Sequence, residues 1–140
     1  MSENLDPDEI TSFLGIEPTK EQRWGESISS CSEKKNKKSG WFLSTKGILY
    51  SLDSRVHLDW ILDRVADKKN EFSELIKREY LIDVCVRWDS RSGHGGPTLS
   101  PKHLSGFGEL GVKVWFDVYF FDEDEGSSRI VVGRGGERIV

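Results

Sequence analysis

The segment SGHGGPTLSP, residues 92–101, joins the two parts of the chain whose sequence patterns are clearest. Before it, residues 80–89 (YLIDVCVRWD) alternate at period two, which predicts a β-strand with one apolar face. After it comes a helix-like stretch, and then residues 112–122 (VKVWFDVYFFD) alternate again. This half of the chain is therefore predicted to run strand, turn, helix and strand.

The residues that begin this helix, predicted over 99–111, occur twice in the chain. Asp6 and Ser100 are good N-cap residues because their side chains accept hydrogen bonds from amides of the first turn, and a proline follows each at the first helical position. The stretches LDPDEITSFLG and LSPKHLSGFGELG also both end in Leu-Gly. The repeat predicts a second helix over 5–15 and two related halves, and it indicates that PTLSP is the start of a helix.

Each helix start also has an apolar residue before the cap and another in the next turn. These pairs, Leu5 with Ile10 and Leu99 with Leu104, are typical of a hydrophobic staple.

The three glycines of the segment have two possible roles. Gly93, Gly95 and Gly96 allow the chain to turn sharply, since glycine adopts positive φ without strain. Their backbone amides could instead bind an anion ahead of a helix N-terminus. The segment lacks both the Lys-Ser/Thr ending of a P-loop and the Gly-x-Gly-x-x-Gly spacing of a dinucleotide loop, so a turn is favoured.

The rest of the chain is less regular. Residues 19–40 are polar, include a cluster of four lysines, and are predicted to form an exposed loop. Residues 41–45 and 48–52 are predicted to be short strands, and the apolar spacing over 54–79 predicts one long helix or two joined by a break. Residues 129–132 are predicted to form a last edge strand.

Together these elements predict an α+β domain. The specific expectation is a two-layer sandwich, with a four- to five-stranded sheet that carries its helices on one face, in a ferredoxin-like arrangement of two related halves. Residues 1–125 would form the single domain, and residues 126–140 a C-terminal edge strand or tail.

The composition limits the partners. The formal net charge is -4, which argues against nucleic acid and suits a basic partner. No apolar run approaches the roughly 20 residues that cross a bilayer, and the acidic N-terminus lacks the pattern of a signal peptide. Cys31 and Cys85 are expected to be free thiols in a reducing cytosol, although a bridge stays open. We therefore predict a soluble cytoplasmic protein with no membrane contact.

Alternation predicts that polar and aromatic side chains of the two clear strands share the sheet face away from the helices. Tryptophan and tyrosine beside charged groups are typical of a protein-binding hot spot. The alternatives are exposed cross-strand pairs of little energetic effect, or an enzyme pocket with paired carboxylates. The candidate partner-binding residues are Asp83, Arg87, Trp115, Asp117, Tyr119 and, in the adjoining loop, His94.

Catalytic and metal sites are not indicated. Asp89, Ser92 and His94 lie close together in sequence, but a Gly-rich turn with no nucleophile elbow is better explained as a solvated polar turn. The three histidines are scattered without the spacing of a zinc site, and His103 is expected to face solvent. No catalytic residue, metal or cofactor is therefore predicted.

Several of these motifs resemble the bacterial family known as domain of unknown function 4279. SGHGGPTLSP, a helix ending in Leu-Gly and a strand ending in FDVYFF are similar to it, and so are LDPDEITSFLGIEPT, the Gly-Trp-Phe-Leu at 40–43 and HLDWILDRV. The resemblance spans residues 5–121, with the motifs in order. Members usually begin with a strand ahead of the first helix, where this chain has four residues, so either that strand is missing or another segment, residues 129–132, takes its place in the sheet. The resemblance implies no activity and no catalytic residues.

The expected function is a non-catalytic protein-binding domain, of the immunity type that neutralises a bacterial toxin by direct binding. This rests on an analogy of size and charge with immunity proteins. Acidic residues near both ends (Asp6, Asp8, Glu9 and 122–125) would favour a basic toxin. The alternative is a small enzyme or ligand-binding domain that uses the Gly93–Gly96 loop and the Asp83/Arg87 face. A housekeeping interaction module is a third possibility.

Overall fold

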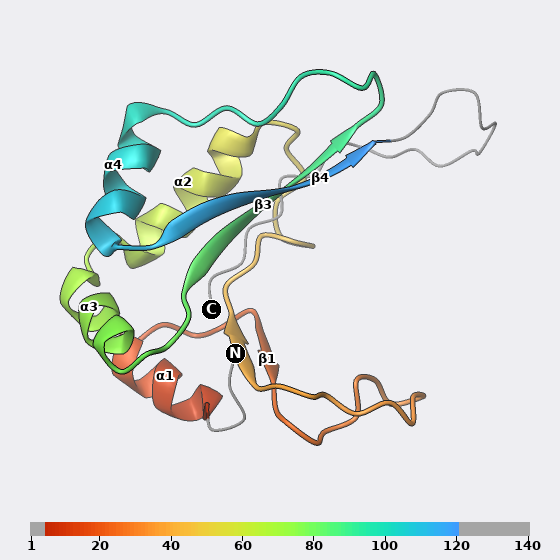
Figure 1. The fold of residues 1–140 in the computed structure, drawn as a ribbon, viewed down its shortest axis with the longest axis vertical. Coiled ribbons are helices and arrows are strands. Elements are labelled where there is room, and N and C mark those ends of the chain that lie inside the picture. The colour runs from red at the N-terminus through yellow and green to blue at the C-terminus, as the bar shows by residue number, and fades with distance from the viewer. Residues whose placement is uncertain (1–4, 121–140) are drawn as a thin grey trace.

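A computed structural model describes residues 5–120, which form four helices and two sheets of two strands each (Figure 1). This mixed content confirms the prediction of an α+β chain. The elements are, in order, α1 (Pro7–Leu14), β1 (Lys20–Gln22), β2 (Gly40–Phe42), α2 (Ser54–Val65), α3 (Lys69–Lys77), β3 (Asp83–Ser90), α4 (Pro101–Leu110) and β4 (Lys113–Phe120). None of the described helices has the length and apolar character needed to span a bilayer.

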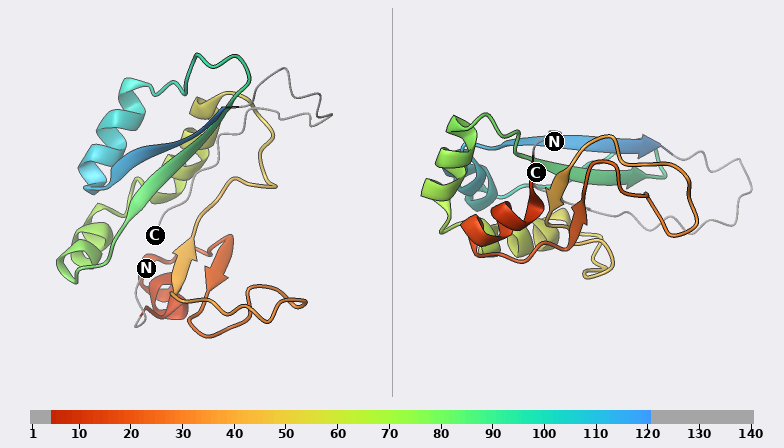
Figure 2. Two further views of the ribbon diagram at one scale, coloured as in Figure 1. Left: turned by 45° about the vertical axis from the view of Figure 1, so that its right-hand side comes forward. Right: turned by 90° about the horizontal axis from the view of Figure 1, so that it is seen from below.

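The second half of the described chain is a βαβ unit. β3 and β4 pair in parallel over eight residues, from Asp83 opposite Lys113 to Ser90 opposite Phe120, and α4 lies between them in sequence. α2 and α4 lie together on one side of this pair (Figure 2). Val84 and Val86 of β3 are fully buried. The strands that alternation predicted are thus present and in register.

The ferredoxin-like sheet of four or five strands is wrong for the described residues. In that arrangement, the two strands of each βαβ unit are separated by a strand of the other half. Here β3 and β4 are hydrogen-bonded directly to each other, while β2 is only three residues long and pairs antiparallel with β1. The first half contributes a helix and this short hairpin, so it does not repeat the second half.

Some local predictions also need correction. The polar stretch 19–40 contains strand β1, and residues 48–52 form a turn and irregular chain in place of a strand. The stretch 54–79 forms two helices, α2 and α3, which was one of the two options. The predictions for 122–125, 129–132 and the tail 126–140 lie outside the described residues.

The repeat holds at the ends of the two capped helices but not along their lengths. The Asp6 carboxylate accepts the N–H of Asp8 at 3.0 Å, and the glycines that follow α1 and α4, Gly15 and Gly111, both have positive φ, 66° and 72°. Ile10 is buried in α1, whereas its counterpart Leu104 in α4 is 62% exposed. The two helices therefore share start and stop signals, while each buries a different face.

Candidate functional site

The outer face of the β3–β4 pair carries the five predicted strand residues. In the parallel register Arg87 lies opposite Asp117. Two residues earlier Cys85 lies opposite Trp115, and two residues later Asp89 lies opposite Tyr119. Opposite residues in a strand pair point to the same side of the sheet, and so do residues two apart along a strand. Asp83, Arg87, Trp115, Asp117 and Tyr119 therefore share one face, which we call the outer face.

Arg87 is held in place from two sides. Its Nε donates to Oδ1 of Asp89 at 3.0 Å, and its guanidinium lies over the ring of Tyr119, 4.4 Å from the centroid. The Asp89 side chain is only 2% exposed, whereas the Arg87 side chain is 45% exposed. The hydrogen bond to Asp89 is the main cause that raises the pKa of Arg87. A buried carboxylate and an aromatic ring thus orient an exposed cation.

The terminal nitrogens of this guanidinium have no partner among the described residues. Within residues 5–120, the only hydrogen bond of Arg87 uses Nε, so no described group accepts from Nη1 or Nη2. A planar guanidinium with two free terminal nitrogens matches the geometry of a carboxylate or of paired carbonyl oxygens.

The two aromatic residues of the outer face are also fixed by hydrogen bonds. Nε1 of Trp115 donates to Oδ1 of Asp83 at 3.0 Å, and the hydroxyl of Tyr119 donates to Oδ2 of Asp117 at 3.1 Å. That bond to Asp117 is the main cause that raises the pKa of Tyr119, which is 40% exposed. The rings therefore present a pre-oriented surface, since little rotamer freedom remains to be lost on binding.

His94 does not join this group. In the described chain its Nδ1 contacts the carbonyl oxygen of Ser92 at 3.1 Å, and its own carbonyl accepts from the hydroxyl of Ser90 at 3.0 Å. Asp89 is engaged by Arg87, so Asp89, Ser92 and His94 do not form a triad. The sixth predicted residue thus lies in the turn.

The glycine-containing loop is tied to the start of α2. The hydroxyl of Ser54 donates to the carbonyl of Thr98 at 2.8 Å, and its oxygen accepts the N–H of Thr98 at 2.9 Å. Ser54 is 2% exposed. Gly93 and Gly95 have φ of 71° and 86°, which side chains with a Cβ rarely adopt. These contacts support the interpretation of this segment as a backbone turn.

His103 was expected to face solvent, and this is wrong: it is 1% exposed. Its Nδ1 accepts the N–H of Ser100 at 3.0 Å, so in the neutral ring Nε2 carries the proton and donates to Oδ1 of Asp59 at 2.6 Å. The sequence signal was Ser-x-x-His, with histidine in the place of the Glu or Gln of a capping box.

The contacts of His103 follow the Ser-His-Asp order of a catalytic triad, but the ring nitrogen near the Ser100 hydroxyl is already engaged. The hydroxyl of Ser100 lies 2.9 Å from Nδ1 of His103, but the backbone N–H of Ser100 occupies the same lone pair. Asp59 also binds Lys102 at 2.7 Å, and the hydrogen bonds from Lys102 and then His103 are the chief causes that lower the Asp59 pKa. The cluster caps α4 and joins it to α2.

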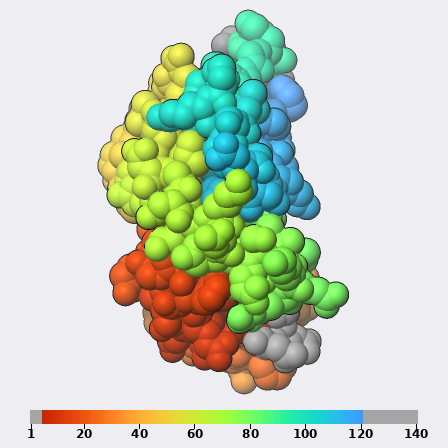
Figure 3. All heavy atoms as spheres, turned by 90° about the vertical axis from the view of Figure 1, so that its left-hand side faces the viewer, coloured from red at the N-terminus to blue at the C-terminus, as the bar shows by residue number. Residues whose placement is uncertain are grey.

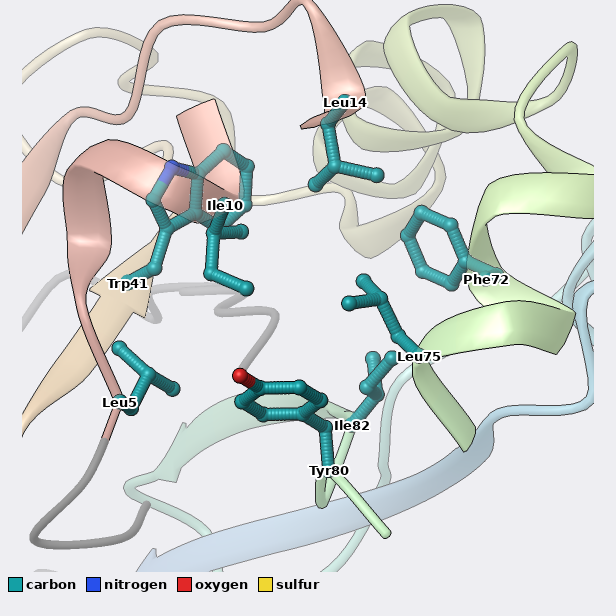
Figure 4. Close-up of a pocket in the computed structure, with 8 residues that line it drawn as sticks. All are labelled: Leu5, Ile10, Leu14, Trp41, Phe72, Leu75, Tyr80 and Ile82. Atoms are coloured by element: carbon teal, nitrogen blue, oxygen red, sulfur yellow. The ribbon is translucent and has the colours of Figure 1, made fainter. Parts of the chain in front are cut away.

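No metal-binding cluster accompanies these residues in the part of the chain that the structure describes. Among residues 5–120 there is no group of three or more His, Cys, Asp or Glu that could hold a metal ion. An apolar cavity of about 20 Å³ lies between α1, β2, α3 and the chain entering β3 (Figure 4), room for one water molecule. Its lining includes none of the predicted site residues: it consists of Leu5, Ile10, Leu14, Trp41, Phe72, Leu75, Tyr80 and Ile82.

The comparisons with known proteins identify one family. The family described as Domain of unknown function (DUF4279) matches residues 1–121. No curated protein and no solved structure matches the chain.

Proposed function

The chain belongs to the DUF4279 family, and we propose that it is a non-catalytic protein-binding domain that acts through its outer face. The proposal is supported by the exposure and the fixed orientation of the Arg87 side chain. It is exposed and oriented by Asp89 and Tyr119, and no group of residues 5–120 accepts from its terminal nitrogens. Arginine, tyrosine and tryptophan are the residues that dominate binding energy at protein interfaces.

Pre-orientation makes such a site effective. Binding normally costs the ordering of long side chains, and here the ring of Tyr119 and the carboxylate of Asp89 already restrict the guanidinium. The partner would supply a carboxylate or main-chain carbonyl oxygens to Arg87, and an apolar group to the rings of Trp115 and Tyr119.

The kind of partner that we propose is a bacterial toxin, which the chain would neutralise as an immunity-type protein. The net charge of -4 favours a basic toxin, because long-range attraction speeds encounter. This is compatible with a local acceptor for Arg87, since the two effects act at different distances. Asp6 and Asp8 contribute less to the attraction than expected, because both form ion pairs with Arg23.

The alternative of a small enzyme or ligand-binding domain has less support. It required the Gly93–Gly96 loop and the Asp83/Arg87 face to act together, and within the described chain His94 makes its contacts in its own turn.

The test is capture from a lysate of the native host with three immobilised forms of the chain: wild type, Arg87→Ala and Arg78→Ala. Arg78 is a matched control, since its Nε also binds a carboxylate, that of Glu74 at 2.9 Å, and its guanidinium also lies over a ring, that of Phe13 at 5.3 Å. Wild type and Arg78→Ala should retain a protein that Arg87→Ala loses.

Co-expression then tests the immunity role. The captured protein should arrest growth when expressed alone, and the wild-type chain should restore growth better than Arg87→Ala does. Equal capture by both arginine variants would contradict the outer face as the binding surface. A captured protein that is not toxic would support a protein-binding function but would contradict the immunity role.

A further inference from the structure

Among the described residues, strand β4 lies at an edge of its sheet. Within residues 5–120 it pairs with β3 alone, and its atoms (blue) run along one side of the space-filling view in Figure 3. It spans eight residues with no glycine or proline, and Phe116 and Val118 are 46% and 42% exposed on the side of the sheet that carries the helices. Protein edges are usually protected by short strands, proline, bulges or charged side chains, and of these β4 has only the charges of Lys113 and Asp117. The length and apolar exposure of β4 suit it to pairing with another strand.

We infer that β4 pairs antiparallel with β4 of a second copy of this chain, with Trp115 at the two-fold axis. In this register Lys113 lies opposite Asp117 of the partner subunit, and by symmetry the same pair forms a second time. Opposite charges directly across an antiparallel pair are stabilising. On the other side of the sheet, Phe116 lies opposite Val114 of the partner subunit, so an exposed apolar side chain meets another apolar one.

Charge selects this register over its neighbours. Moving the axis to Asp117 would place the two Asp117 carboxylates directly opposite each other, which is destabilising. Moving it to Phe116 would place Lys113 opposite Tyr119 of the partner subunit and Asp117 opposite the partner subunit's Trp115, so neither charge would meet its opposite. Only the Trp115 register pairs both charged residues of β4.

The dimer would contain a four-stranded sheet in the order β3, β4, β4, β3. Because opposite residues point to the same side, the two copies of Arg87 and Tyr119 would lie on the same face of this sheet. The chain would then present two outer faces side by side, a bivalent surface for a partner that is itself dimeric or repetitive.

The experiment measures molecular mass by sedimentation velocity for the full chain. Wild type is expected to dimerise, and Lys113→Glu and Asp117→Lys should each weaken the dimer at least tenfold because both put like charges opposite each other. Lys113 is exposed, so its replacement should leave folding intact, which circular dichroism checks. Lys46→Glu, an equal charge change at an exposed residue outside β4, is the control and should dimerise as wild type does.

A mixture of the two charge-reversed variants tests the register most directly. Lys113→Glu and Asp117→Lys chains should form a one-to-one dimer with each other, since the new carboxylate at position 113 meets the new ammonium at position 117 and the two original charges also pair. A monomeric wild type at about 100 μM, or a dimer that the Lys113→Glu change leaves intact, would overturn the inference. Arg87→Ala should dimerise as wild type does, so that loss of the dimer can be told apart from loss of partner binding at the outer face.

Discussion

Two glycines in α4 provide a test of how this helix lies on α2. A Cβ added at Gly106 would lie 2.8 Å from both Cδ atoms of Leu62 and 3.3 Å from its Cγ, whereas a Cβ at Gly108 would meet nothing within 4 Å. Both residues are helical, so alanine at either position gains the same intrinsic preference, about 1 kcal/mol at most. Gly108→Ala should therefore stabilise the chain by about 0.5–1 kcal/mol.

Gly106→Ala should not show this gain. Leu62 is 5% exposed, so its methyl groups can move away only by displacing other core atoms, and overpacking of this kind costs about 1–3 kcal/mol. The two variants should differ by about 1–3 kcal/mol in free energy of unfolding, measured by urea denaturation followed by circular dichroism. In the Gly106→Ala background, Leu62→Ala should cost less than it costs in wild type. Equal stabilisation by both alanines would show that α4 does not approach α2 at Leu62.

Three further predictions concern the helix start, acid stability and the outer face. Ser100→Ala with Pro101→Ala should lower stability by about 1–2 kcal/mol in urea denaturation, through loss of the cap and of chain rigidity, and an unchanged curve would refute a role for PTLSP as a helix start. The pKa of Asp59 is lowered in the folded state by the ammonium group of Lys102 and the imidazole group of His103. The contribution of Asp59 to the stability of the fold is therefore present above the unfolded pKa of about 3.9 and is lost as the pH falls through the folded pKa. Asp59→Asn should therefore be less stable than wild type at neutral pH, with a gap that narrows below about pH 4; a gap independent of pH would contradict this. Trp115→Ala and Tyr119→Ala should each reduce the free energy of binding to the captured partner, measured by calorimetry, more than they reduce the free energy of unfolding. A larger loss in the free energy of unfolding would indicate a structural role.

Local signals allowed the best-predicted parts of the fold to be recognised from sequence. The cap at Asp6 and the positive-φ glycines after α1 and α4 depend on contacts within a few residues, so neighbouring letters were sufficient. The common face of Arg87 and Trp115 followed from period-two alternation in two long strands, which their parallel register preserves.

Non-local contacts explain what the sequence did not show. β1 has no apolar alternation, and it is defined only by its antiparallel pairing with β2, where Glu21 lies opposite Trp41. His103 is buried because its ring hydrogen-bonds across to Asp59 of α2, a partner 44 residues away. The direct pairing of β3 with β4 likewise could not be read from alternation, which gives the face of each residue but not the order of strands.

The role of Arg87 and its outer-face neighbours in binding can be measured as the affinity of the chain for the captured partner. Calorimetric titration should compare wild type, Arg87→Ala and the matched control Arg78→Ala, after unfolding curves have shown that all three are folded. Arg87→Ala should weaken binding at least tenfold, or by about 1.4 kcal/mol, while Arg78→Ala should bind as wild type does. Equal dissociation constants for the two variants would contradict the role of Arg87 in binding.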